Sequence, residues 1–344
     1  MPTSINITLL LFFSLIFYSV DSFSQKQAKA VCVAFYNTEN LYDTINDPTI
    51  NDEEFLPTGV SRWTSDKYLR KIDHISSVIS QIGDEFIKGG PTMIGLSEIE
   101  NRGVLEDLIH SEALRNSGYA IAHFDSPDRR GVDVALLYKK KDFLLVNAVA
   151  VPLHMPNQPD FRTRDQLVVT GLLDNDTVTV VVNHWPSRGN DVPYRIAAAT
   201  LTHHIADSLY ARNRDARILI MGDLNDDPID ESIQTTLGAQ GKITKVKAGG
   251  LFDPMWQMFK DGIGSLAYKD SWNLFDQIIV SEPLIRENTA SWKLYKTRVF
   301  KKPFMIQPDG QYAGYPFRTF SGGTYTGGYS DHLPVFVILV KEKK

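Results

Sequence analysis

Apolar residues are concentrated in ten short runs along the chain, and polar segments separate these runs. Most are rich in Val, Ile, Leu and aromatic residues and are bounded by turn-forming residues, a pattern that predicts β-strands. The runs span residues 30–36, 92–97, 119–124, 132–138, 143–151, 166–173, 177–185, 217–223, 274–280 and 334–340. Several are continuously apolar rather than alternating, which is typical of strands covered on both faces.

Two longer segments between these runs have helical periodicity instead. Residues 65–87 begin with Ser65 as a helix cap and repeat apolar side chains at helical spacing. Residues 192–212 have the same apolar spacing. Strands with helices between them indicate an α/β fold of two packed sheets with helices outside. Residues 321–330 are rich in glycine, but a strand follows them directly, so we interpret them as a loop over a site and expect one domain over residues 25–344.

The first residues of the chain have the pattern of a secretory signal. An apolar run from Leu9 to Val20 precedes the small residues Ser22 and Ser24, which predicts a signal peptide over residues 1–24. An uncleaved anchor or a buried helix is the alternative. We therefore expect an exported protein, periplasmic or extracellular, without stable membrane insertion after cleavage.

Composition narrows the class of protein. The chain has 344 residues, 43% of them hydrophobic and 22% charged, values that are typical of a globular protein with a large core. The net charge of −5 excludes a global positive field that would attract nucleic acid, so any phosphate binding must be local. The single cysteine, Cys32, lies in an apolar run and is expected to be buried.

Polar residues follow several of the predicted strands at the point where each strand ends. Asn37 and Glu98 come directly after their strands, and an amide with a carboxylate could begin a site for a hard cation such as Mg²⁺. Glu100 is equally available, so the choice of Glu98 depends on its position. Asp223 and Asn225 are two residues apart and would point the same way on an extended segment, where they could hold a water; an Asx turn before Pro228 is a compatible alternative.

Histidines occupy two further strand ends. His184 ends a long apolar run and could donate to a phosphate oxygen or act as an acid, although a buried structural histidine is the commoner explanation for such a residue. Asp331 and His332 precede the last strand and would point to opposite sides of an extended chain. A histidine that acts as a base needs a separate carboxylate to orient it, and Asp276 is the best-placed candidate.

Taken in order, the motifs YNTEN, LSEIE, NHWPS, GDLNDDP, FDQIIV and SDHLP resemble the endonuclease/exonuclease/phosphatase superfamily, which includes deoxyribonuclease I. The resemblance covers nearly the whole mature chain and implies a four-layered αββα sandwich. It also implies a metal site made by Glu98, Asn37 and Asp331. His332, held by Asp276, would act as general base or as a contact to the transition-state phosphate.

The same resemblance suggests the remaining roles. Asp223 and Asn225 would position the attacking water and the phosphate, and His184 would match the second histidine of the deoxyribonuclease-like members. Arg162 and Arg164 both precede a strand where the family often has an arginine, and we favour Arg164 for a phosphate contact. The implied cofactor is Mg²⁺, with Mn²⁺ or Ca²⁺ as alternatives.

We therefore expect a monomeric, exported, metal-dependent phosphodiesterase that acts on DNA or RNA. Residues 292–304 are basic and aromatic and could follow a nucleic-acid backbone, or they could form an amphipathic strand with lysines facing solvent. A phospholipid, sugar-phosphate or inositol-phosphate esterase of the same fold is the alternative enzyme. A binding module that has lost catalysis is the alternative from another class, and the intact acidic and histidine residues argue against it.

Overall fold

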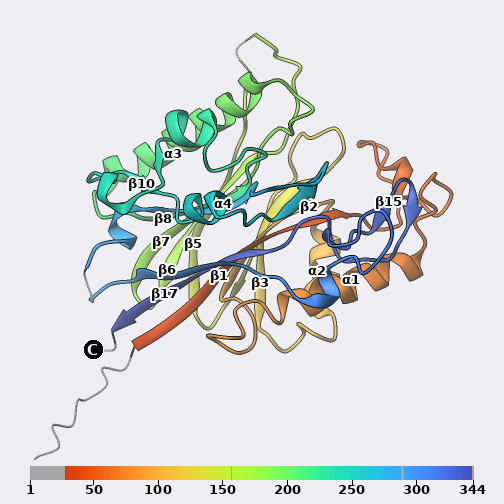
Figure 1. The fold of residues 1–344 in the computed structure, drawn as a ribbon, viewed down its shortest axis with the longest axis horizontal. Coiled ribbons are helices and arrows are strands. Elements are labelled where there is room, and N and C mark those ends of the chain that lie inside the picture. Colours follow the sequence, from red (N-terminus) through yellow and green to blue (C-terminus); the bar gives the residue numbers. More distant parts are fainter. Residues whose placement is uncertain (1–27, 156, 288–289, 343–344) are drawn as a thin grey trace, which may run out of the picture.

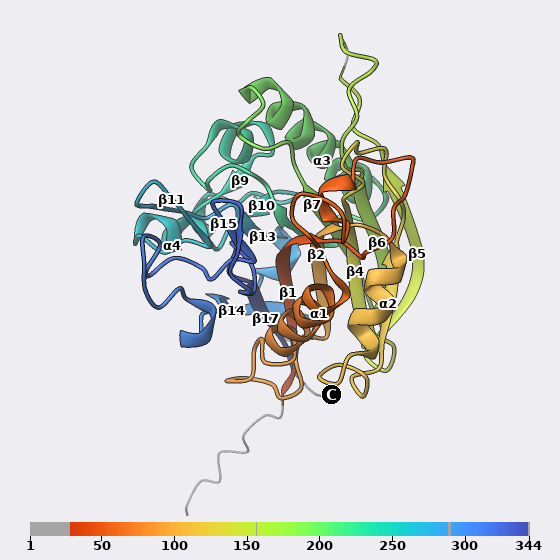
Figure 2. The same cartoon turned by 90° about the vertical axis from the view of Figure 1, so that its right-hand side faces the viewer.

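The computed structural model describes residues 28–155, 157–287 and 290–342, so the predicted signal peptide lies outside the described residues. Two β-sheets pack face to face, and helices cover their outer faces (Figure 1, Figure 2). This is the four-layered αββα sandwich expected from the sequence. No helix in the described ranges has the length and apolarity needed to cross a membrane.

The first sheet has six strands in the order β14-β17-β1-β2-β4-β3. Its strands are β1 (Ala28–Leu41), β2 (Met93–Ile99), β3 (Tyr119–His123), β4 (Asp133–Lys139), β14 (Lys293–Val299) and β17 (Val335–Glu342). β1 and β2 are parallel, whereas β17 runs antiparallel to β1. The start of the last strand therefore lies beside the end of the first.

The second sheet has seven strands in the order β5-β6-β7-β8-β13-β10-β9. Its strands are β5 (Phe143–Val151), β6 (Gln166–Leu173), β7 (Asp176–His184), β8 (Arg217–Asp223), β9 (Ala239–Gln240), β10 (Leu251–Phe252) and β13 (Asp276–Ser281). All ten apolar runs identified in the sequence form strands of these two sheets. β7 and β8 are parallel and β13 is antiparallel to β8, which repeats the arrangement of the first sheet.

Within the described residues, four α-helices cover the sandwich and two small hairpins extend it. The helices are α1 (Ser65–Ile79), α2 (Arg102–His110), α3 (Val192–Arg212) and α4 (Trp256–Lys260). Short 3₁₀ and π segments span Glu53–Phe55, Ser232–Thr236, Ile243–Lys245, Glu282–Leu284 and Pro303–Met305. The hairpins pair β11 (Leu266–Tyr268) with β12 (Ser271–Asn273) and β15 (Phe320–Ser321) with β16 (Thr324–Tyr325).

The helix expected over residues 65–87 is shorter than its periodicity suggested. α1 ends at Ile79, and turns follow. Gly83 has φ +80, a left-handed conformation that cannot continue an α-helix. Ile82 is nevertheless fully buried, so the apolar repeat continues beyond the helix that it appeared to define.

Apolar side chains form three buried layers. Val33, Phe35, Met221 and Val337 belong to the layer between the two sheets. The opposite face of the first sheet packs against α1 and α2, where Cys32 is buried as expected. α3 packs against the opposite face of the second sheet. Strands covered on both faces explain why their sequences are continuously apolar.

Candidate active site

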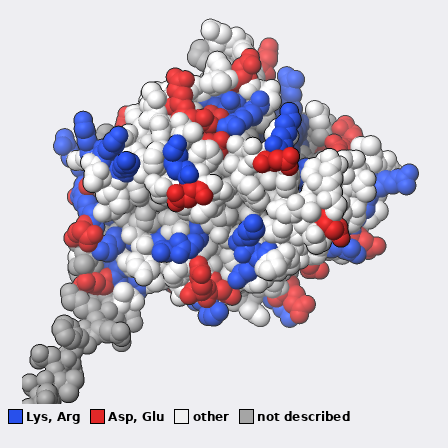
Figure 3. Space-filling model, viewed as in Figure 1, with Lys and Arg blue, Asp and Glu red and all other residues white. Residues whose placement is uncertain are grey.

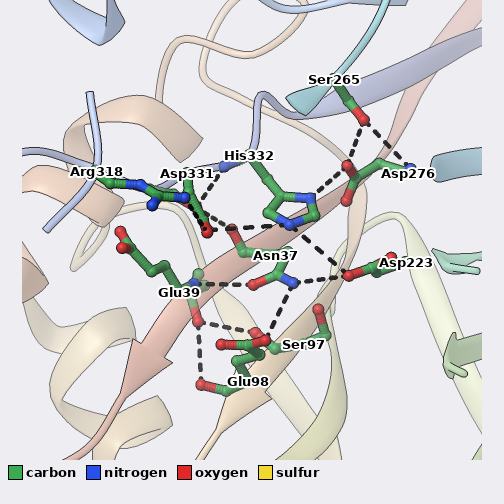
Figure 4. A network of polar contacts seen from close by, with 12 residues as sticks. Asn37, Glu39, Ser97, Glu98, Asp223, Ser265, Asp276, Arg318, Asp331 and His332 are labelled. Carbon is green, nitrogen blue, oxygen red and sulfur yellow. Dashed lines mark hydrogen bonds and ion pairs between the residues drawn. The ribbon is translucent and has the colours of Figure 1, made fainter. Parts of the chain in front are cut away.

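The polar residues at the strand ends meet at one end of the sandwich. In the second sheet His184 and Asp276 both pair in register with Asp223. In the first sheet Asn37 pairs with Ser97, the residue before Glu98. Because the sheets face each other, these side chains lie within one cluster. Figure 4 shows Asn37, Glu98, Asp223 and Asp276 within it.

The backbone around this cluster leaves the strand conformation abruptly. Glu39, Asn40, Glu98 and Asn225 all have positive φ, between 51° and 61°. The pairing of β1 with β2 shifts register here, as a β-bulge does. Non-glycine residues in this conformation store strain that often marks functional sites, and here they turn side chains inward at the strand ends.

Asn37 links the two sheets at the centre of the cluster. Its Nδ2 donates to Asp223 Oδ2 at 3.0 Å and to Glu98 Oε1 at 3.5 Å. Glu98 Oε2 accepts from the backbone N–H of Asn40 at 2.8 Å. His184 Nε2 lies 3.7 Å from Asp223 Oδ2 and 3.8 Å from Glu98 Oε1. Two carboxylates, an amide and an imidazole therefore converge from β1, β2, β7 and β8.

Glu100, which the sequence could not separate from Glu98, lies outside this cluster. Its carboxylate accepts the backbone N–H of Asp43 at 2.6 Å. Glu98 keeps a side-chain exposure of 14%, whereas Glu100 is buried. Of the two acids, Glu98 is therefore the one that could hold a cation open to substrate.

A buried chain of hydrogen bonds orients His332. Its Nδ1 lies 2.6 Å from Asp276 Oδ2, and Asp276 also accepts the hydroxyl of Ser265. The other ring nitrogen, Nε2, lies 3.8 Å from Asp223 Oδ2. Asp276 therefore fixes the ring so that Nε2 faces the cluster, an arrangement suited to proton transfer or to a phosphate contact.

Burial and neighbouring charges give the two histidines different protonation. Burial alone lowers the pKa of His332, but the carboxylates of Asp276 and Asp223 outweigh it and raise this pKa well above the usual value. Burial, together with the positive charges of Arg164 and Arg130, lowers the pKa of His184 well below the usual value. His332 is therefore cationic and His184 neutral near pH 7, which suits His332 to bind a phosphate oxygen.

Asp223 is the carboxylate whose protonation is most sensitive to its surroundings. Burial raises its pKa to about 7, the positive charge of His332 opposes this rise, and the charges of Asp276 and Glu98 add to it. A carboxylate with a pKa near neutrality is well matched to accept a proton from water.

The composition of the cluster fits a hard divalent cation. Beside the imidazoles it contains two carboxylates and an amide, and the single cysteine of the chain lies in the core rather than in the cluster. A cation would relieve the mutual repulsion of Glu98 and Asp223. Glu98 is the residue best placed to hold it, and Asn37 could assist by turning its amide, because its Nδ2 faces both acids and its Oδ1 accepts the N–H of Glu39.

A second group of possible metal ligands lies at the edge of the first sheet. His123, Asp125 and Asp133 have ligand atoms within 4.8 Å of one another. Asp133, however, already accepts hydrogen bonds from Ser126 and faces His123 Nε2 at 3.1 Å. His123 and Asp133 are thus paired within the β3–β4 connection, which they support, and Asp125 is exposed to solvent.

Asp331 lies at the rim of the cluster rather than beside Glu98. Its Oδ2 accepts from Arg318 Nη2 at 2.8 Å, and its Oδ1 lies 3.9 Å from His332 Nε2. No hydrogen bond joins Asp331 to His332 within the described ranges, as expected, but the two side chains do not point to opposite sides, because the Asp331 carboxylate lies near the His332 ring. Arg318 occupies one of the two oxygens that a metal ligand would offer.

Asn225 and Arg164, both predicted as site residues, lie in positions that differ from those expected from the sequence. Asn225 has φ 53°, so it does not follow Asp223 as an extended neighbour; its Nδ2 donates to Trp185 O at 3.0 Å, and its N–H closes an Asx turn on Asp223. Arg164 is almost fully buried, and its guanidinium donates to two backbone carbonyls and to Asp128. This placement favours support of the β7 end over a phosphate contact.

Other residues complete the site, and the sequence argument missed them. Arg130 has a side-chain exposure of 48% and lies 3.7 Å from Glu98, and it also donates to Asn40. Glu39 and Lys71 form a buried ion pair at 3.7 Å that ties β1 to α1. The sequence signal for Arg130 was the dipeptide of arginines just before the fourth predicted strand.

Comparison with known proteins agrees with this architecture. The sequence matches the model of the Endonuclease/Exonuclease/phosphatase family over residues 32–341. A Bacteroides thetaiotaomicron protein of that family aligns with 17% identity and a TM-score of 0.57, covering 92% of this chain and all of the other. No curated protein matches the sequence.

Two further solved structures have described ligands or activities. D. rerio TDP2, complexed with a single strand DNA product, has 13% identity and a TM-score of 0.55, with 90% of this chain and 98% of the other covered. The mannosyl-6-phosphatase of Bacteroides thetaiotaomicron has 18% identity and a TM-score of 0.54, with 90% and 99% covered. At these identities the structures show that the fold is shared.

Proposed function

Because the chain belongs to the endonuclease/exonuclease/phosphatase family, we propose that it hydrolyses phosphodiester bonds with a divalent cation, which is expected to be Mg²⁺. The observation that carries the proposal is the cluster in which Glu98, Asp223 and the His332–Asp276 pair meet around Asn37. When bound, the cation would polarise the phosphoryl group and offset its negative charge. The side chains of the cluster supply the remaining chemistry.

The protein's own residues account for binding and proton transfer. His332, held cationic by Asp276, donates from Nε2 to a phosphoryl oxygen, where negative charge grows in the transition state. Asp223 accepts a proton from the attacking water, for which its raised pKa is suited. Neutral His184, whose Nε2 lies next to Glu98 and Asp223, donates a further hydrogen bond to the phosphate.

We further propose short single-stranded nucleic acid as the substrate. Arg130 and Arg318 present partly exposed guanidinium groups beside the cluster, where they can contact the phosphates that flank the bond to be cleaved. The similarity to a TDP2 structure with single strand DNA product supports this choice. The charged side chains in Figure 3 are mixed in sign and form no continuous basic tract on the face shown, which favours a short ligand over a long duplex.

The basic segment at residues 292–304 fits the amphipathic strand, one of the two interpretations of its sequence. It contains the edge strand β14, and of its aromatic side chains Trp292 and Phe300 are buried and Tyr295 and Phe304 are exposed. Base stacking over this strand is therefore limited.

A sugar phosphate is the second candidate substrate. The acidic net charge and the similarity to a mannosyl-6-phosphatase favour it. Purified mature protein would be assayed with Mg²⁺, and with EDTA as control, on single-stranded DNA, RNA, duplex DNA and hexose phosphates. Cleavage of single strands that EDTA abolishes is the expected result, and hydrolysis confined to hexose phosphates would replace the substrate proposal.

A further inference from the structure

A cavity of about 360 Å³ opens on the surface beside the cluster. Its lining combines three aromatic rings with two cationic side chains, namely Tyr268, Tyr312, Tyr315, Lys269 and Arg318. Flat apolar faces with a few charged groups are typical of a ligand site, and the excess of positive charge selects an anionic ligand.

The cavity is joined directly to the proposed catalytic residues. Leu266, which precedes a lining residue of the β11 strand, forms a β-bridge with His332, and Leu333 N donates to Ser265 O at 2.7 Å. On the other side, Arg318 lines the cavity and also binds Asp331 at 2.8 Å. A ligand in the cavity is therefore next to the phosphate site.

The walls of the cavity are held in place before any ligand binds. At the tip of the β11–β12 hairpin, Asp270 N donates to Tyr315 Oη at 2.7 Å, and Tyr315 Oη donates to Asp270 Oδ1 at 2.6 Å. Gln307 N also donates to Tyr315 O at 2.8 Å. Figure 2 shows this hairpin, labelled β11, beside the blue segment that leads to β15.

The aromatic faces that remain open are those of Tyr268 and Tyr312. Tyr268 is 62% exposed and Tyr312 is 38% exposed, whereas Tyr315 is partly covered. Lys269 Nζ lies 5.2 Å from the centre of the Tyr268 ring, so a positive charge accompanies the open ring. The Tyr312 ring also contacts the Tyr315 ring, with their centroids 5.9 Å apart, so Tyr315 supports it from one side. The exposed part of each ring suits stacking with a planar group.

We infer that this cavity is a nucleotide subsite, in which Tyr268 and Tyr312 stack with a base while Lys269 and Arg318 bind its phosphate. The inference deepens the proposed function, on which it rests for the identity of the neighbouring phosphate site. A hexose would need several free hydrogen-bonding side chains around its hydroxyls. Apart from the tyrosine hydroxyls and the two cations, the lining offers Gln311 and Asp270, and the carboxylate of Asp270 is already bound to Tyr315. Stacking on aromatic side chains is independent of base identity, so single strands of any sequence would bind.

The test measures binding rather than catalysis. Calorimetry in EDTA would compare a thymidine tetranucleotide with a tetranucleotide of the same charge whose sugars carry no bases. The wild-type protein is expected to bind the first about tenfold more tightly, the effect of stacking one base. The Tyr268→Ala/Tyr312→Ala double variant is expected to bind both alike. Tyr295→Ala is the matched control, because Tyr295 is 61% exposed on β14 and does not line the cavity.

Each result decides the question. Equal binding of the two tetranucleotides by the wild-type protein, or an unchanged ratio in the double variant, would overturn the subsite. Binding of glucose 6-phosphate that depends on the same two tyrosines would assign the cavity to a sugar phosphate instead. If base-dependent binding is present but no phosphodiester is cleaved with Mg²⁺, the subsite is supported and the proposed activity fails.

Discussion

Replacing Asp276 with asparagine removes the negative charge that faces His332 and keeps the size of the side chain. The two side chains are 2.6 Å apart, and Asp276 is fully buried. The amide keeps the volume of the carboxyl group but no longer stabilises a positive ring. Two unit charges about 4 Å apart in a medium of effective dielectric constant 20 attract by about 4 kcal/mol, equivalent to about three orders of magnitude in an equilibrium.

Part of this energy survives in the variant, because Asp223 also faces His332 and raises its pKa. We therefore expect kcat for a chromogenic phosphodiester to fall by about 100-fold to 1000-fold, within the range that proton-transfer groups contribute. The pKa of His332 would fall, since burial then opposes the remaining charge. The high-pH limb of the rate profile, where a cationic histidine loses its proton, should move to lower pH.

The assay would measure kcat and KM with saturating Mg²⁺ across the pH range, alongside thermal unfolding. Ser265→Ala is the graded control, since it removes one hydrogen bond to Asp276 and leaves the charge; a loss of about tenfold or less is expected. Retention of more than a third of wild-type kcat by folded Asp276→Asn, with an unmoved pH profile, would refute the role given to the pair.

Three further predictions concern the metal site and the core. Glu98→Gln should raise the Mg²⁺ concentration for half-maximal activity by about tenfold or more, whereas Glu100→Gln should leave it unchanged; equal effects in a metal titration would contradict the ligand assignment. Burial raises the pKa of Asp253 to about 7, and its Oδ2 has no hydrogen-bond partner among the described residues, so native protein binds the proton more tightly and loses stability as pH rises from about 4 to 7. Asp253→Asn should remove this pH-dependent loss, so that the free energy of unfolding at pH 8, measured with urea, changes by up to about 4 kcal/mol less relative to pH 4 than in the wild-type protein. An unchanged pH dependence in the variant would contradict the role given to Asp253. Leu339→Ala should lower the free energy of unfolding by about 2–5 kcal/mol, because Leu339 is fully buried between the sheets, and a loss under 1 kcal/mol in the same experiment would contradict that packing.

The strands were predictable because each of them carries its own apolar signal. A strand that is buried on both faces has a continuously apolar sequence, and all ten runs form strands of the two sheets. The end of α1 was less predictable, because Ile82 belongs to the core although the chain turns before it. Periodicity reports which side chains are buried, not which backbone conformation buries them.

The site was predictable only where side chains follow strands in register. His332 and Asp276 are 56 positions apart in the chain, and the structure places them together. Their contact was predicted because each of them lies at the end of a predicted strand. Asn225 differs because a left-handed residue breaks the alternation on which the argument depended. Arg130 and Arg318 come from irregular loops. The pair of arginines before the fourth predicted strand draws attention to Arg130, but no local pattern encodes the path by which either loop reaches the site.

The pairing of β17 with β1 determines when the site can exist during synthesis. His332 leads into β17, which occupies an interior position of the first sheet between β14 and β1. A nascent chain that has not yet released its last residues from the ribosome lacks both the histidine and a central strand. The proposed hydrolysis therefore requires β17, and a fragment truncated before residue 331 is expected to be inactive and to leave the edge of β1 open to aggregation.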